Sequence, residues 1–194
     1  MSRSKRTDPR SIRATRRLQR PNRARLRVIT RQPRQGFHHP ADERDILELL
    51  NAVGPMAIYG LRIIELARMP NGSVFKPVFG RYCVPGRILI YEQPLPPWRL
   101  PGVIETATAS QLARAGAILT LLPEVGATVV DWPAGTLRRF MLQEVLLHEV
   151  GHHVLQHHKG KRPAKVARVK DHEAFAARFA ERERTALRKK RGGE

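Results

Sequence analysis

The spacing of apolar residues in the first half of the chain predicts one helix followed by a small group of strands. In residues 46–53 apolar side chains recur every three or four positions, which predicts a helix of about three turns ending before Gly54. Residues 57–67 are rich in β-branched and aromatic side chains and predict a strand. Residues 80–84 and 87–92 are two shorter runs of the same kind, and a Pro-Gly pair between them predicts a hairpin.

The second half of the chain shows a longer helical period. The proline-rich residues 94–97 are expected to end the regular structure of the first half. Residues 110–115 predict a helix, residues 117–122 fit either the end of that helix or a new strand, and residues 127–132 predict a strand. A long helix is then expected over residues 136–158, followed by a basic loop and a final helix. This order of elements predicts an α+β domain.

Charge divides the chain into a near-neutral centre and two basic ends. The 194 residues contain 36 Lys and Arg against 17 Asp and Glu, a formal net charge of +19. Residues 1–36 hold 13 of these basic side chains and one acid, and residues 159–194 hold 13 and five acids. No apolar run is long enough to cross a membrane, no secretory signal follows the basic start, and a single cysteine, Cys83, excludes an internal disulfide. We therefore expect one soluble, cytoplasmic domain.

The basic ends suggest a domain plan and a partner. Residues 1–36 contain few large aliphatic side chains, so we expect a disordered extension, followed by a folded domain over residues 37–190 and a basic tail over residues 191–194. Arginine-rich ends attach to nucleic acid because each neutralised phosphate releases counterions. Residues 1–36 also fit an organellar targeting segment or a tail that merely adheres to ribosomes.

One motif in the long helix carries chemistry. Residues 148–152 read HEVGH, the HExxH pattern. At 3.6 residues per turn, His148 and His152 lie about 40° apart on one face and roughly 6 Å apart along the axis, so both can ligate one Zn²⁺. Glu149 can then act as a general base towards water. The alternative is an amphipathic helix whose His and Glu side chains merely face solvent.

A zinc site of this kind needs a third protein ligand. Glu173, near the start of the final helix, shares a helical stripe with small alanines that would let this helix approach another closely. Its neighbour His172 is an alternative ligand. His158 stands six residues after His152, but on an unbroken helix it would point about 240° away from His152. Glu173 is therefore the preferred candidate.

Other residues are weaker candidates for a role at the site. Glu144 lies one turn before His148 and either hydrogen-bonds a ligand or is solvated. Tyr59, Tyr82 and Tyr91 are possible donors to an oxyanion, or simply aromatic residues of strands.

Residues 148–158 (HEVGHHVLQHH) resemble the HExGHxxLxH run of the ImmA/IrrE-like peptidases, which are gluzincin-type zinc enzymes. Glu173-Ala174 and Phe179-Ala180 are similar to the E-A-N-x-F-A segment of that family. Phe175 stands where the family has Asn, and the Phe-Ala pair comes two residues late.

The resemblance implies a minimal zincin-like fold, with His148, His152 and Glu173 as zinc ligands and Glu149 as general base. It also implies an edge strand that binds substrate in extended form, for which residues 88–92 and 127–132 are the candidates. We therefore expect a zinc-dependent peptidase, with the basic ends holding it near nucleic-acid-associated protein substrates. The rival hypothesis is a non-catalytic nucleic-acid-binding or ribosome-associated protein with a zincin-shaped domain.

Overall fold

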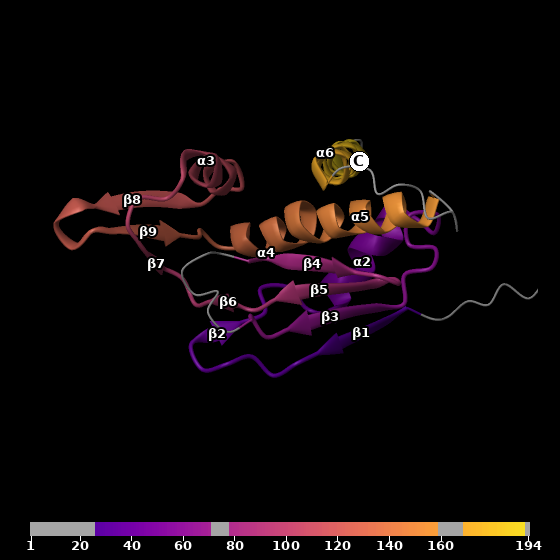
Figure 1. The fold of residues 1–194 in the computed structure, drawn as a ribbon, viewed down its shortest axis with the longest axis horizontal. Helices are drawn as coiled ribbons and strands as arrows, with labels where there is room; N and C mark the ends of the chain where they lie inside the picture. Colours follow the sequence, from indigo (N-terminus) through magenta and orange to yellow (C-terminus); the bar gives the residue numbers. More distant parts are fainter. Residues whose placement is uncertain (1–25, 71–77, 159–168, 193–194) are drawn as a thin grey trace, which may run out of the picture.

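The computed structural model describes residues 26–70, 78–158 and 169–192, and it is a mixed α+β structure (Figure 1). The prediction of an α+β fold is therefore confirmed. The helical elements are α2 (Glu43–Val53), α3 (Thr106–Arg114), the short η2 (Pro123–Val125), α4 (Thr136–Phe140), the π-helical η3 (Met141–Leu146), α5 (Leu147–His158) and α6 (Val169–Gly192). The strands are β1 (Arg27–Thr30), β2 (Phe37–His38), β3 (Ile63–Ala67), β4 (Gly80–Cys83), β5 (Arg87–Tyr91), β6 (Gln93–Pro94), β7 (Trp98–Pro101), β8 (Ile118–Leu122) and β9 (Ala127–Asp131).

The main sheet has four strands in the order β1-β3-β5-β4. β1, β3 and β5 are parallel, whereas β4 is antiparallel to β5, as the predicted hairpin requires. Because successive side chains of a strand alternate between faces, one face of the sheet carries an apolar set that is almost completely buried. These residues are Ile64, Leu66, Ile88 and Ile90.

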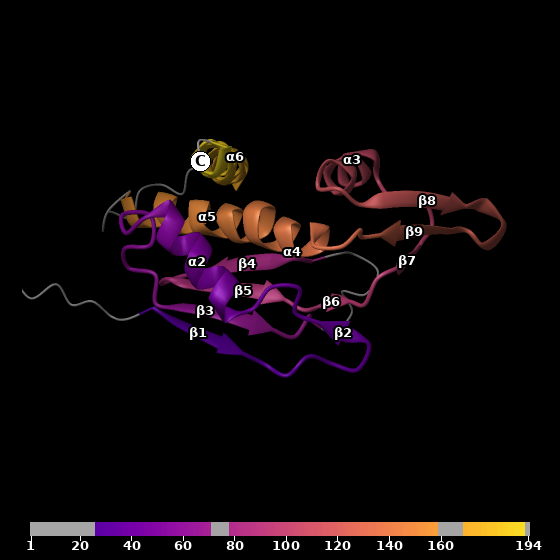
Figure 2. The same ribbon diagram turned by 180° about the vertical axis from the view of Figure 1, so that it is seen from behind.

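Helices cover that apolar face. α2 and the continuous helix formed by α4, η3 and α5 lie on the same side of the sheet, as Figures 1 and 2 show from opposite directions. α2 begins with a capping box, in which the side chains of Asp42 and Asp45 each accept the backbone N–H of the other residue. Asp45 also pairs with Arg138 of α4, so the start of α2 is fixed against the long helix.

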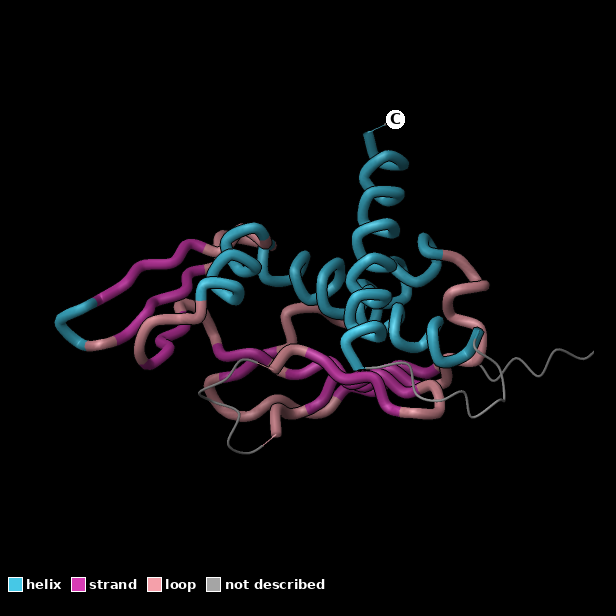
Figure 3. The backbone as a smooth tube through the Cα atoms, turned by 45° about the horizontal axis from the view of Figure 1, so that its top comes forward, coloured by secondary structure: helices cyan, strands magenta, loops and turns pink. Residues whose placement is uncertain are grey.

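β2 and β6 pair as a short two-stranded sheet, and three further strands extend the fold to one side. β7, β9 and β8 form a separate antiparallel sheet, with α3 beside it, at the end of the molecule away from the α5 C-terminus (Figure 1). Trp98, Trp132 and Phe140 pack ring against ring where this sheet joins the main core. α6 lies across α5 as an outer layer, with the end of the chain at its tip (Figure 3).

The structure changes or settles three predicted segments. Residues 57–60 form turns, residues 61–62 are irregular and only Ile63–Ala67 is a strand, because β3 begins where its neighbours β1 and β5 become available for pairing. Residues 95–97 do interrupt regular structure, but only briefly, because β6 includes Pro94 and β7 begins at Trp98. The ambiguous residues 117–122 are resolved as a strand, β8, which pairs with β9.

The expected domain boundaries also change. Residues 27–30 of the predicted disordered extension form β1, and Arg31 and Arg34 pair with Glu65 and Glu92. The boundary at residue 36 is therefore wrong, because a short, apolar-poor segment is ordered here by strands far along the chain. Residues 1–25 lie outside the described residues. α6 extends to Gly192, so the tail expected from residue 191 begins within a helix. No helix in the described part of the chain has the length and apolar character needed to cross a membrane.

Candidate metal centre

Two imidazoles meet on one face of α5. His148 and His152 are one helical turn apart, and their Nε2 atoms are 3.1 Å from each other. The rings meet edge to face, with centroids 4.7 Å apart. The side chains are 28% and 16% exposed, so both remain accessible from one direction. This is the spacing that the HExxH pattern predicts.

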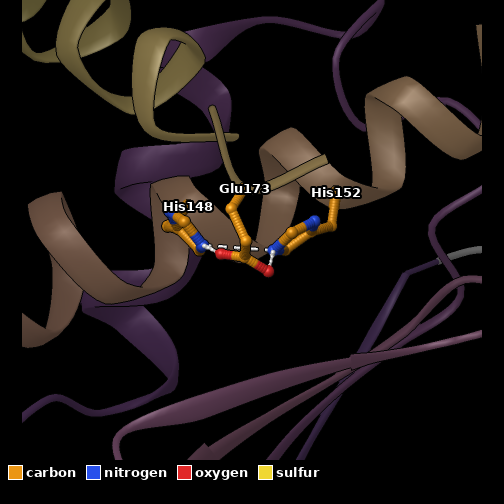
Figure 4. Close-up of side chains that lie close together, drawn as sticks. All are labelled: His148, His152 and Glu173. Atoms are coloured by element: carbon orange, nitrogen blue, oxygen red, sulfur yellow. Dashed lines mark hydrogen bonds and ion pairs between the residues drawn. The ribbon is translucent and has the colours of Figure 1, made fainter. Parts of the chain in front are cut away.

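A carboxylate from α6 completes the cluster. Oε2 of Glu173 is 3.1 Å from Nε2 of His148, and its Oε1 is 3.4 Å from Nε2 of His152. Figure 4 shows both imidazoles and the carboxylate pointing toward one another. One atom from each of the three residues lies within 4.8 Å of the other two, so the cluster could hold a metal ion. The structure thus brings together the three residues predicted as ligands, while their ligation of a metal stays a prediction.

Close packing of α5 and α6 makes this meeting possible. A Cβ atom on Gly151 of α5 would stand 2.8 Å from the Cα of Ala176 and 3.2 Å from the Cβ of Phe179 on α6. Glycine is therefore required for the two helices to approach this closely. Ala176 lies one helical turn after Glu173, so this contact sets the position from which Glu173 reaches the imidazoles.

The electrostatics of His152 favour the form that binds metals. Burial lowers the pKa of His152, and the neighbouring His148 lowers it further, while Glu173 acts in the opposite direction. A lowered pKa keeps the imidazole neutral at neutral pH. The neutral ring has the free nitrogen lone pair that a metal requires.

Glu149 lies beside the cluster but is not part of it. Its side chain is buried, and burial raises the pKa of Glu149 to about 7, even though the backbone N–H of Tyr82 donates a hydrogen bond to its carboxylate. A carboxyl group that titrates near neutrality can both accept and return a proton. A Cβ atom at Gly80 would stand 3.3 Å from Oε1 of Glu149, so the sheet edge lies directly against this carboxylate.

The strand beside the cluster is β4, at the edge of the main sheet. The N–H of Tyr91 donates to the carbonyl of Phe79, and in an antiparallel ladder this pairing directs the peptide groups of Gly80 and Tyr82 away from β5. Both predictions for the edge strand beside the site, residues 88–92 and residues 127–132, are wrong. β5, which covers most of residues 88–92, is an interior strand between β3 and β4, and β9 (Ala127–Asp131) is the central strand of the three-stranded sheet.

The remaining candidates do not take the roles expected of them. His172 is not one of the clustered residues, and the side chain of His158 lies outside the described residues. The hydroxyl of Tyr82 accepts a hydrogen bond from the N–H of Gly86, and Tyr59 is largely exposed. Glu144 pairs with Arg184 of α6, so neither of its expected roles describes it.

Sequence reasoning missed the surroundings of the cluster. Arg184 and Arg188 lie on the same face of α6 as Glu173, and with Arg114 of α3 they line a cleft that reaches His148 and Glu149. Arg184 and Arg188 follow Glu173 at helical spacing, so the sequence alone could have placed them on the same face of the helix. Nothing in the sequence indicates that Arg114 of α3 joins them, because this depends on how α3 and α6 are placed relative to each other in the fold. Comparison of the chain with protein-family models, with curated proteins and with solved structures gives no match.

Proposed function

We propose that this protein is a zinc-dependent peptidase with a minimal zincin-like fold, similar to the ImmA/IrrE-like enzymes. The observation that carries the proposal is the convergence of His148, His152 and Glu173, with the buried carboxyl group of Glu149 beside them. Two helices supply the three donors, and α5 also supplies the acid. That arrangement matches the roles that the HExxH pattern assigns to each position.

The distances between the donor atoms suit zinc. Ligand atoms about 2.0–2.1 Å from a tetrahedral Zn²⁺ lie about 3.3 Å from one another. The two Nε2 atoms are 3.1 Å apart. Oε2 of Glu173 is 3.1 Å from Nε2 of His148, and the other carboxylate oxygen, Oε1, is 3.4 Å from Nε2 of His152. Two imidazole nitrogens and one carboxylate oxygen are also a ligand set found in catalytic zinc sites, with a fourth position left for water or substrate.

The protein residues around the cluster have separate tasks in peptide hydrolysis. When bound, zinc supplies a Lewis acid that polarises the substrate carbonyl group and makes water more acidic. The Glu149 carboxylate takes a proton from the attacking water and passes it to the leaving amine. An extended peptide pairs with the outward peptide groups of β4 at Gly80, which lies against Glu149.

A Glu149→Gln variant tests this function. The variant keeps the three proposed ligands, so the purified protein should retain about one zinc per chain, whereas cleavage of a peptide library should disappear. His148→Ala should lose both zinc and cleavage. A wild-type protein that binds no zinc, or a Glu149→Gln variant that cleaves as well as the wild type, would contradict the proposal.

Nucleic-acid attachment is a second, separate proposal for the basic ends. Residues 1–36 and 159–194 carry nearly all of the excess positive charge, while the centre of the chain is close to neutral. Such segments bind phosphates without sequence preference. They would hold the peptidase near protein substrates that are themselves bound to DNA or RNA. In a non-catalytic nucleic-acid-binding protein, the Glu149→Gln variant would leave binding unchanged and there would be no cleavage to lose.

A further inference from the structure

A cleft of about 880 Å³ runs from the candidate metal centre along α6. It shares Gly80, His148 and Glu149 with a smaller pocket of about 420 Å³ that contains the metal centre, so the two spaces adjoin. α3 and α6 lie on the same side of the long helix, above α4 and α5 in Figure 1. The cleft takes Gln111 and Arg114 from α3, and Glu181, Arg184 and Arg188 from α6.

The face of α6 that carries Glu173 also lines this cleft. Ala177, Ala180, Arg184 and Arg188 follow Glu173 at the three- and four-residue spacing of one helical face. The alanines leave space between α6 and the long helix. Arg184 pairs with Glu144, which lies four residues before His148 on the same continuous helix. The arginine end of the cleft therefore begins close to the metal centre.

At the end of the cleft away from the metal centre, the arginines outnumber the glutamates that pair with them. Arg184 pairs with both Glu144 and Glu181. Within the described ranges of the chain, Arg114 and Arg188 form no ion pair. Burial lowers the pKa of the Arg184 guanidinium, and the charges of Arg188 and Arg114 lower it further, so the three cations lie near one another. An anion placed between them would relieve this repulsion.

We propose that the arginine end of the cleft, formed by Arg114, Arg184 and Arg188, binds an aspartate or glutamate side chain of the peptide substrate. The inference rests on the proposed peptidase function and adds a specificity to it. Guanidinium groups bind carboxylates through two parallel hydrogen bonds, which suits a single acidic side chain entering from the metal end.

The distance from the metal centre places this acidic residue within the substrate. An extended peptide advances about 3.3 Å per residue. The four residues of helix from Glu144 to His148, followed by the reach of the arginine side chains, correspond to roughly two to four residues of extended peptide from the scissile bond. The cleft lies on one side of the metal centre only, so the preference applies to one side of that bond.

Peptide hydroxamates test the proposal by binding, without cleavage. A hydroxamate group ligates zinc and so fixes where the peptide begins. The full chain carrying Glu149→Gln and loaded with zinc is titrated with two fluorescent series, one with the hydroxamate at each end of the peptide. Within each series a single Glu is moved along positions one to four, and each peptide is compared with its Gln counterpart by fluorescence anisotropy.

We expect the Glu peptide to bind about tenfold more tightly than its Gln counterpart at one position of one series. Arg114→Gln with Arg188→Gln should abolish that difference. Arg178→Gln with Lys189→Gln removes the same charge from α6 outside the lining of the cleft and should leave it intact.

Four outcomes would overturn the inference. Equal affinity for Glu and Gln at every position would show that the metal centre binds peptides without this preference. Loss of the preference in the control variant would show only a general effect of net charge. Displacement of the peptide by a short oligonucleotide that depends on Arg114 and Arg188 would make this a phosphate site. Failure of every hydroxamate peptide to bind would overturn the inference together with the zinc centre, which metal analysis would show separately.

Discussion

Gly151 of α5 lies directly against Ala176 of α6, so closely that a Cβ atom at position 151 would stand 2.8 Å from the Ala176 Cα. This contact lies between the helix that carries the imidazoles and the helix that carries the carboxylate. The metal centre depends on the helix crossing as much as on its ligands. Several consequences of this arrangement can be measured.

A Gly151→Ala variant separates helix propensity from helix packing. Alanine would stabilise an isolated helix by about 1 kcal/mol relative to glycine. Here the added methyl group forces α6 away, so we expect a loss of about 1–3 kcal/mol in the free energy of unfolding and weaker zinc binding. Urea titration and competition with a chelator measure the two effects. Gln156→Ala, at an exposed position of α5, is the control, and a stabilised Gly151→Ala protein would contradict the close approach.

The third ligand is tested by a pair of neighbouring variants. Glu173→Gln removes the carboxylate that lies 3.1 Å from His148, so zinc affinity should fall by roughly 100-fold. His172→Gln should change the affinity by less than about threefold, because His172 is not among the clustered residues. Both affinities are measured by competition with a chromogenic chelator. A larger loss in His172→Gln than in Glu173→Gln would assign the ligand to His172 instead.

The sequence predicted the donors of the metal centre better than it predicted the surroundings of that centre. His148 and His152 are four residues apart on one helix, so their meeting follows from the helical repeat alone. Glu173 required a second inference, from the small residues around it, that two helices approach closely. The edge strand was misidentified because strand order depends on pairing between distant segments, and nothing local distinguishes β4 from β5.

The same limit explains the N-terminal boundary. Residues 26–36 are poor in apolar side chains and rich in arginine, a composition typical of disorder. Their order comes from partners far along the chain: β3 pairs with β1, Glu65 with Arg31 and Glu92 with Arg34. The composition of a segment carries no information about partners that lie about 30 to 60 residues away in the sequence, so it could not predict that this segment is ordered.

Glu92 provides a pH-dependent test of that anchoring. Burial alone would raise the pKa of Glu92, but hydrogen bonds from Arg34 and from the backbone N–H of Met69 outweigh it and hold the pKa below the ordinary value. The ionised form is therefore stabilised in the folded state. This contribution is present at pH values above the pKa of the unfolded chain and is lost as the pH falls through the lower, folded pKa.

We expect Glu92→Gln to lose about 3 kcal/mol of unfolding free energy at pH 7, because Arg34 loses a fully buried partner. The difference from the wild type should shrink as the pH falls through the lowered pKa of the folded state, where the wild-type carboxyl becomes protonated as well. Glu48→Gln, which removes an exposed ion pair with Arg44, should cost less than about 0.5 kcal/mol. Urea titrations at several pH values measure all three proteins. A Glu92→Gln deficit that is constant with pH would contradict the ionised state of Glu92.

Two deletions distinguish the basic segment that precedes the described fold from the strand that follows it. Removing residues 1–25 takes away ten Lys and Arg side chains and one acid but leaves β1 in place, so the unfolding free energy should change little.

If this segment binds nucleic acid, the slope of log affinity against log salt concentration should become shallower by about 0.7–0.9 for each phosphate that the segment neutralises in the full chain. Removing residues 1–36 also deletes β1 and, with it, Arg31 and Arg34, which pair with Glu65 and Glu92, and should destabilise the domain strongly. Binding to a single-stranded oligonucleotide at several salt concentrations, together with thermal unfolding of each protein, measures both effects. An unchanged salt slope after deletion of residues 1–25 would remove that segment from the proposed attachment and leave the second basic end as its source.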